Sequence, residues 1–81
     1  MIQVEARLYA TLRKYHPEGK AGEALVYELA EGTTIQKLLE NELGVPPGEV
    51  KIVFVNGISQ SFDHVLADGD RVGIFPPVGG G

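Results

Sequence analysis

The chain has 81 residues, the length of one domain, and its 43% hydrophobic and 22% charged residues are typical of a folded protein. The formal net charge of −4 argues against a nucleic-acid partner, because such proteins normally present a concentrated basic face. Cysteine is absent, which excludes disulfides, thiolate metal sites and cysteine nucleophiles within this sequence.

The first third of the chain predicts two strands separated by a turn and a loop. Apolar and polar residues alternate over Ile2–Leu8 and again over Leu25–Leu29, which is the period of a half-buried strand. Residues 9–15 predict a short helical turn with Leu12 pointing inward, and residues 16–22 are rich in breakers, as loops are. We therefore expect the two strands to pair as an antiparallel hairpin.

Residues 33–44 predict the main helix. Thr33 or Thr34 can cap its first turn, and Thr33 with Gln36 fits a capping box. Gly44 supplies a left-handed cap at the other end, after which Val45 can pack back on the last turn. One apolar stripe lies between these ends, at positions i, i+3, i+4 and i+8: Ile35, Leu38, Leu39 and Leu43.

A second hairpin follows the helix. Residues 50–55 are rich in β-branched side chains and predict a strand with one face in the core and the other exposed or covered. The Asn56-Gly57 pair is a strong hairpin signal, since both positions tolerate positive φ. The returning strand, residues 58–62, is short and polar, as an edge strand is expected to be.

The last strand is Arg71–Phe75, which follows a tight Asp-Gly-Asp turn at residues 68–70. Val72 and Ile74 point inward in this strand, and Phe75 lies on the opposite face. One amphipathic helix needs a sheet face on which to bury its stripe, so the whole order predicts a two-layer α+β domain.

The order of the elements is similar to that of the ubiquitin-like β-grasp, a mixed sheet of four to five strands packed on one main helix. By that analogy, the first and last strands pair in parallel at the centre of the sheet. We expect the β-grasp domain to span residues 1–77 and a flexible glycine tail to span residues 78–81.

No set of side chains predicts catalysis or a metal site. Asp63 and His64 are neighbours, but neighbours on an extended chain point to opposite faces and cannot readily act on one atom. Asp68 and Asp70 lack the other ligands of a calcium loop, which favours a plain turn. We therefore expect a substrate or carrier with no bound cofactor, rather than an enzyme. No apolar run approaches the roughly 18 residues of a membrane span and no signal peptide is recognisable, which predicts a cytoplasmic protein without a membrane partner.

The C-terminus is the remaining reactive group. Glycine lets a foreign surface approach closely, and Pro76 and Pro77 stiffen the stalk before the tail. Four extended residues reach roughly 13 Å at about 3.3 Å each, which suits a narrow channel in a partner protein. Taken alone, the tail could equally be a frayed end or an expression scar. Its residues are Val78, Gly79, Gly80 and Gly81.

A set of residues in the last third of the chain stands in the order seen in the MoaD/ThiS family of sulfur carriers. The terminal Gly80-Gly81 makes the chain resemble most closely the MoaD branch, the small subunit of molybdopterin synthase. The matching residues are Val55-Asn56, Phe62-Asp63-His64, Leu66, Asp68-Gly69-Asp70, Val72 and Phe75-Pro76-Pro77-Val78.

The resemblance implies a defined chemistry at Gly81. A MoeB- or ThiF-like enzyme would adenylate the Gly81 carboxylate with ATP. A sulfur donor such as a cysteine desulfurase or rhodanese would then replace the adenylate, leaving a thiocarboxylate. The tail would enter a MoaE-like large subunit and pass sulfur to a pterin precursor. A carrier without cysteine has to hold sulfur elsewhere, and the C-terminus is available.

Docking to such partners needs a surface, and an apolar patch is what an interaction surface requires. Phe75 points away from the core side chains of its strand, and Phe54 lies on one face of the 50–55 strand. Together with Pro76 and Pro77 they predict a docking surface. The competing expectation is that residues 9–20 cover them.

Two departures from the MoaD pattern leave alternatives open. The tail has three glycines rather than two, and residues 14–23 form a long polar loop without a counterpart. A relative that serves thiazole synthesis, tRNA thiolation or tungsten cofactor assembly remains possible on these grounds. So does a ubiquitin-like modifier that joins Gly81 to lysines, or a binding module that does not use Gly81.

Overall fold

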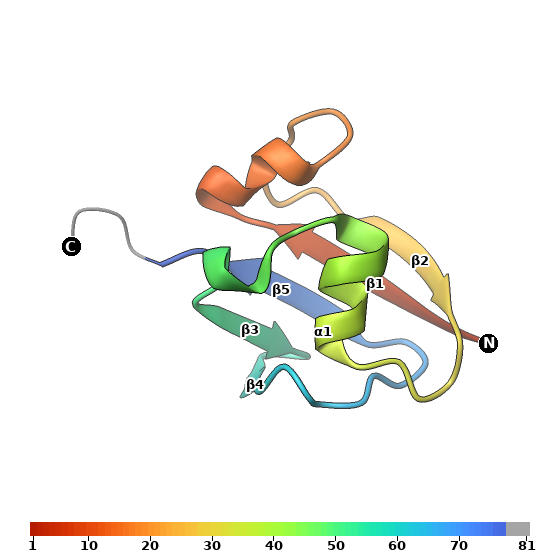
Figure 1. Cartoon of the computed structure of the whole chain (residues 1–81). Helices are drawn as coiled ribbons and strands as arrows, with labels where there is room; N and C mark the ends of the chain where they lie inside the picture. Colours follow the sequence, from red (N-terminus) through yellow and green to blue (C-terminus); the bar gives the residue numbers. More distant parts are fainter. Residues whose placement is uncertain (78–81) are drawn as a thin grey trace.

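The computed structural model describes residues 1–77, which form a twisted sheet with one main helix packed on one face (Figure 1). The N-terminus and the last described residues lie at opposite ends of the molecule. No helix in this part of the chain is long and apolar enough to span a membrane. The elements are β1 (Ile2–Leu8), the 3₁₀-helix η1 (Ala10–Tyr15), β2 (Leu25–Leu29), α1 (Ile35–Lys37), the π-helix η2 (Leu38–Leu43), the 3₁₀-helix η3 (Pro47–Glu49), β3 (Ile52–Val55), β4 (Ile58–Gln60) and β5 (Arg71–Phe75).

The sheet has the strand order β2-β1-β5-β3-β4 within the described residues. β1 and β5 are parallel, with Glu5 opposite Arg71 and Leu8 opposite Ile74, and the remaining pairs are antiparallel. This confirms the predicted two-layer α+β arrangement and the β-grasp order, with a mixed five-stranded sheet. Because β1 and β5 run the same way, their ends meet at the same edge of the sheet.

The core lies between the sheet and the helix, and the predicted apolar stripe of the helix faces it. All four stripe residues are buried, as is Leu12 from η1. Gly44 ends η2 with a φ of 68°, and the N–H of the buried Val45 donates to the Leu39 carbonyl at 2.9 Å. Both predictions for the helix end are therefore confirmed. The sheet contributes Val4, Ala6, Leu8, Val53, Val55, Val72 and Ile74 to this core.

The start of the helix confirms one of the two predicted caps and not the capping box. Thr34 is the N-cap, and its side-chain oxygen accepts the backbone N–H of Lys37 at 3.3 Å. The Thr33 hydroxyl donates to an upstream carbonyl instead, so the predicted Thr33–Gln36 capping box is wrong. The backbone N–H of Gln36 donates to the Phe62 carbonyl at 2.9 Å. A segment distant in sequence thus satisfies an amide at the helix start, which is where unpaired N–H groups occur.

Both strands of the second hairpin are shorter than predicted. β3 begins at Ile52 because η3 occupies the preceding residues and the Val50 N–H donates to the Pro47 carbonyl at 3.1 Å. β4 ends two residues earlier than expected, at the edge of the sheet. The turn between them is as predicted, since Asn56 and Gly57 have φ values of 53° and 84°.

The Asp-Gly-Asp segment at 68–70 joins three parts of the fold. The carboxylate of the buried Asp70 accepts the side-chain N–H of Asn56 at 2.9 Å and the backbone N–H of Ala67 at 2.8 Å. The Asp68 carboxylate accepts the Gln3 N–H at 2.7 Å. Both carboxylates serve the fold, which confirms the plain turn. Within residues 1–77 no group of three His, Asp or Glu side chains is placed to hold a metal ion.

Candidate docking face and C-terminal tail

The four tail residues lie outside the described residues. The expected roles of Gly81 as the reacting terminus and of Val78, Gly79 and Gly80 in a partner channel therefore stay predictions, as does the flexible tail at 78–81. What the structure does describe is the place where the tail leaves the fold.

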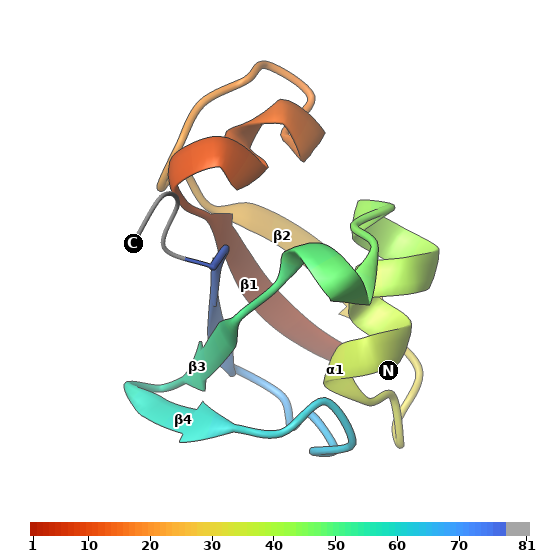
Figure 2. The ribbon, with the colours of Figure 1, turned by 60° about the vertical axis from the view of Figure 1, so that its left-hand side comes forward.

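The end of β5 is held on both sides up to its last residue. The Tyr9 N–H donates into β5 at 3.1 Å, and the Lys51 N–H donates to the Phe75 carbonyl at 2.9 Å. Pro76 is half-buried and Pro77 exposed, and neither has an N–H with which to continue the pairing, as predicted. The chain therefore leaves the sheet at Pro76, between the end of β1 and the start of β3 (Figure 2).

Three rings gather on the face of the sheet opposite the helix, which we call the outer face. Tyr9 and Phe75 stack with centroids 4.5 Å apart and planes 2° apart, and Phe54 meets Phe75 edge-on at 5.6 Å and 89°. Stacked and edge-on contacts are the favoured geometries of aromatic pairs. All three rings are half-buried. We call Tyr9, Phe54 and Phe75 the aromatic cluster.

A hollow of about 220 Å³ opens beside the aromatic cluster. Two glycines, Gly57 and Gly73, line it and add no side chains, while Arg7 and Arg71 stand at its polar side. A Cβ at Gly73 would lie 3.4 Å from the Phe75 ring and 3.5 Å from the Tyr9 ring. A methyl group at Gly73 would thus touch both rings at ordinary contact distance, and a larger side chain would displace them.

The structure brings the predicted docking residues together. Phe54 and Phe75 touch, Pro76 follows directly, and Pro77 is exposed beyond it. The role of these four residues in docking stays a prediction. Sequence reasoning missed Tyr9, although the alternation of β1 extended by one step places it on the outer face with Arg7. The competing expectation was that residues 9–20 cover the docking residues. It is confirmed only in part, because Tyr9 lies on Phe75 but neither ring is fully buried.

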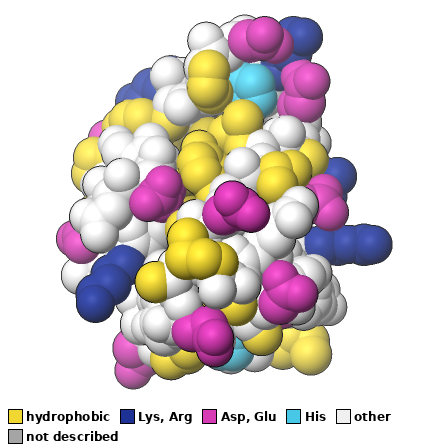
Figure 3. Space-filling model, turned by 90° about the vertical axis from the view of Figure 1, so that its right-hand side faces the viewer, with side chains coloured by type: hydrophobic (Ala, Val, Ile, Leu, Met, Phe, Trp, Pro, Cys, Tyr) yellow, Lys and Arg dark blue, Asp and Glu magenta, His cyan; other side chains and the backbone are white. Residues whose placement is uncertain are grey.

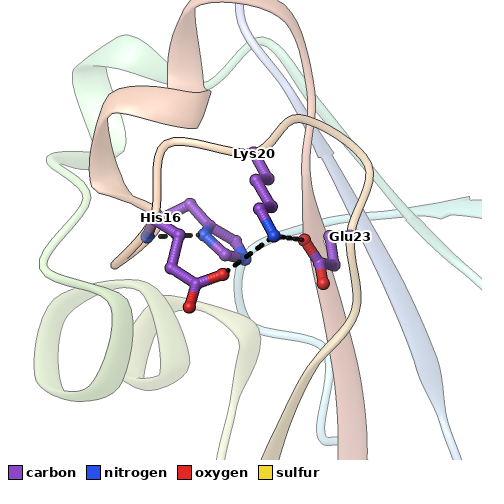
Figure 4. Close-up of polar contacts among 4 residues, drawn as sticks. His16, Lys20 and Glu23 are labelled. Atoms are coloured by element: carbon purple, nitrogen blue, oxygen red, sulfur yellow. Dashed lines mark hydrogen bonds and ion pairs between the residues drawn. The ribbon is translucent and has the colours of Figure 1, made fainter.

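The polar loop that follows η1 is ordered by its own contacts (Figure 4). His16 is only 7% exposed, and its Nδ1 accepts the Glu18 N–H at 2.9 Å. Above it, the Lys20 ammonium pairs with Glu18 at 3.1 Å and with Glu23 at 3.7 Å. The Gly22 N–H then donates to the end of β1 at 2.8 Å. This loop therefore returns to the base of the aromatic cluster, where a Cβ at Gly22 would lie 3.4 Å from the Tyr9 ring.

Glu49 connects η3 to η1 at the edge where β5 ends. Its carboxylate accepts the Tyr15 hydroxyl at 2.7 Å and pairs with the Lys14 ammonium at 3.1 Å. The hydrogen bond from Tyr15, followed by that from Lys14, lowers the pKa of Glu49, and the same contacts raise the pKa values of Tyr15 and Lys14. The two helices that flank the exit of the tail are thereby linked to each other.

Asp63 and His64 make hydrogen bonds to other residues and not to each other. The Ser61 hydroxyl donates to the Asp63 carboxylate, and the His64 carbonyl accepts the Ile35 N–H at 3.1 Å. No hydrogen bond between the Asp63 and His64 side chains occurs in the described structure. The adjacent acid and imidazole therefore give no sign of a catalytic pair.

Comparison with known families identifies the chain. The sequence model of the Mut7-C ubiquitin family matches residues 1–79. The chain belongs to this family. A search of functionally curated proteins found no significant match.

Solved structures extend the likeness to the whole fold. A candidate molybdopterin converting factor, subunit 1, from Pyrococcus furiosus is 29% identical with a TM-score of 0.74, over 96% of this chain and 100% of the other. The Haloferax volcanii HVO 2177 protein is 30% identical with a TM-score of 0.69, over 99% and 87%. The H. volcanii small archaeal modifier protein 1 is 18% identical with a TM-score of 0.72, over 96% and 100%, and shows the fold alone.

These matches confirm the resemblance to MoaD-like proteins and the β-grasp fold. The chain is a small ubiquitin-like protein of the Mut7-C ubiquitin family.

Proposed function

We propose that this protein is a sulfur carrier whose Gly81 carboxylate is adenylated and then converted to a thiocarboxylate, which donates sulfur in molybdopterin biosynthesis. The observation that carries the proposal is the exit of the Phe-Pro-Pro stalk beside the aromatic cluster, at the end of a strand held on both sides. Such an arrangement lets docking energy position a distant carboxylate, which is an orientation effect. The likeness to the P. furiosus protein over the full chain supports the choice of pathway.

The chemistry needs no side-chain catalyst from this chain. In the proposed first step, a carboxylate oxygen of Gly81 attacks the α-phosphorus of ATP on a MoeB- or ThiF-like enzyme, and pyrophosphate leaves. The outer sulfur of a persulfide on a cysteine desulfurase or rhodanese then attacks the acyl carbon, and AMP leaves. A second thiol reduces the resulting acyl disulfide, which releases the thiocarboxylate and leaves the donor cysteine and that thiol joined as a disulfide. The resulting thiocarboxylate enters a MoaE-like subunit or another acceptor enzyme. Glycine adds no steric block beside the reacting carbonyl in any of these steps.

Mass spectrometry of the intact protein tests the proposal. After incubation with ATP, the activating enzyme and a sulfur source, the mass is expected to rise by one exchange of oxygen for sulfur. A variant without Gly80 and Gly81 is the control, because it keeps residues 1–77 but lacks the Gly81 carboxylate and ends instead at Gly79. An unchanged mass in the complete reaction would exclude sulfur carriage.

Conjugation to lysines is the second candidate, and the fold that the chain shares with the H. volcanii small archaeal modifier protein 1 favours it. It uses the same adenylate, but a lysine amine replaces AMP. The same reaction mixture distinguishes the two, since conjugation gives adducts of higher mass whose digestion leaves a glycine remnant on lysine. A pure binding module would keep its partner after loss of Gly80 and Gly81.

A further inference from the structure

The polar side of the hollow differs in charge from the rest of the molecule. The chain carries a net charge of −4, yet the charged side chains that line the hollow are two arginines, Arg7 and Arg71. The end of the molecule where the N-terminus lies shows acidic side chains among separate apolar ones, with fewer basic side chains (Figure 3). A local positive charge on an acidic protein favours an acidic partner at that place.

The backbone places the two arginines on the outer face. In the parallel pairing of β1 with β5, Arg7 lies opposite Gly73 and Arg71 lies opposite Glu5. Residues opposite each other in a sheet share a face, so both guanidinium groups stand beside the aromatic cluster. Asn56 fixes the start of β5 by accepting the Arg71 N–H at 3.0 Å. The positions of the charges are therefore set by the sheet.

Neither arginine makes a strong ion pair within residues 1–77. Arg7 contacts the Glu5 carboxylate at 3.5 Å, and both side chains are 37% exposed, which is a weak surface pair. Arg71 is exposed, and among residues 1–77 no carboxylate lies within ion-pair distance of it. Guanidinium groups bind carboxylates with two parallel hydrogen bonds. Both groups thus keep donors for a partner.

We infer that Arg7 and Arg71 select a partner that places an apolar side chain in the hollow and carboxylates against the two guanidinium groups. The inference rests on the proposed function, and it assigns this acidic, apolar surface to the enzyme that adenylates Gly81. A second copy of the chain is a poor occupant, because a twofold contact through this face brings like charges together. The chain's own terminal carboxylate is another candidate ligand for the two arginines, and the test below distinguishes it from a partner protein.

The test is ATP–pyrophosphate exchange by the adenylating enzyme of the same organism, measured against the concentration of the full-length chain. The double variant Arg7→Glu/Arg71→Glu is expected to raise KM by about tenfold or more, since like charges at an interface cost several kcal/mol. The kcat at saturation is expected to be unchanged. For wild type, added salt should raise KM, because rim charges are screened.

The matched control is Arg13→Glu/Lys37→Glu, which gives the same net charge through exposed residues that do not line the hollow. It is expected to keep the wild-type KM. Circular dichroism of all variants reports whether the fold persists. The more conservative pair Arg7→Gln/Arg71→Gln, expected to give a smaller rise in KM, replaces the charge reversal if that variant unfolds.

Each result has one meaning. An unchanged KM in the arginine variants overturns the inference and leaves the proposed function standing. An equal rise in the control variant also overturns it, because net charge would then be the cause. A lower KM would show that the arginines hold the chain's own terminus, again against the inference. If wild type gives no exchange that depends on Gly81, the proposed function fails and the inference fails with it.

Discussion

Replacing Phe75 with aspartate places a charge at the centre of the aromatic cluster. Phe75 stacks on Tyr9 and receives the edge of Phe54, and each aromatic pair contributes about 0.5–1.5 kcal/mol beyond area burial. A half-buried ring adds roughly half of the ~1.5–3 kcal/mol that full burial of such a side chain gives. The expected loss in the free energy of unfolding is therefore about 2–4 kcal/mol.

This loss is smaller than the stability of a typical domain of the same length. At roughly 0.05–0.15 kcal/mol per residue, such a domain has about 4–12 kcal/mol in total. We expect Phe75→Asp to remain folded at 25 °C, with a thermal midpoint lower by roughly 8–32 °C. Adenylation of Gly81 is expected to be lost, since the charge occupies the proposed docking face.

Two measurements check this expectation. Thermal unfolding followed by circular dichroism gives the loss of stability, and ATP–pyrophosphate exchange well below the midpoint gives the loss of docking. Val26→Asp is the matched control, because Val26 is an exposed apolar residue of β2 on the outer face, opposite Glu5 and outside the aromatic cluster. Normal adenylation of folded Phe75→Asp would refute the docking role of Phe75.

Three further predictions concern the surroundings of the site and the fold. Gly73→Ala should keep the stack of rings, because its Cβ meets them at ordinary contact distances, whereas Gly73→Val should separate them and weaken near-ultraviolet dichroism. Gly44→Ala should cost about 1–2 kcal/mol in urea unfolding for its left-handed φ, and Gly48→Ala, which has no positive φ and equally open space, should be near neutral. Glu49→Gln should be less stable than wild type above pH 4.5, the ordinary pKa of Glu49. Because the folded state lowers the pKa of Glu49, the difference between the two free energies of unfolding should shrink as pH falls below 4.5. A difference that stays constant with pH would contradict the role of the ionised carboxylate.

Local patterns were enough to predict most elements of the fold. The period-2 alternation predicted the bounds of β1, β2 and β5, because a strand with one buried face records that face in every second residue. The apolar stripe of the helix and its left-handed end at Gly44 were equally local, as was the turn at Asn56 and Gly57. Each of these features depends on residues at most eight positions apart.

The features that the sequence did not predict depend on residues that are distant along the chain. The capping box would have used the Gln36 N–H, but this amide donates to the Phe62 carbonyl instead, and Thr34 is the cap. The same applies to the candidate site. Tyr9 belongs to it because β1 pairs with β5, which brings the end of one strand against Phe75 at the end of the other.

The sequence alone thus determined that a reactive C-terminus follows a Phe-Pro-Pro stalk, since those residues are contiguous. Only the tertiary structure decided what surrounds that stalk: a stacked ring from the residue after β1, an edge-on ring from β3 and two arginines on neighbouring strands. The reason is physical. Periodicity records which face of a strand is buried, whereas the neighbours across a sheet are set by strand order and register, which no single segment contains.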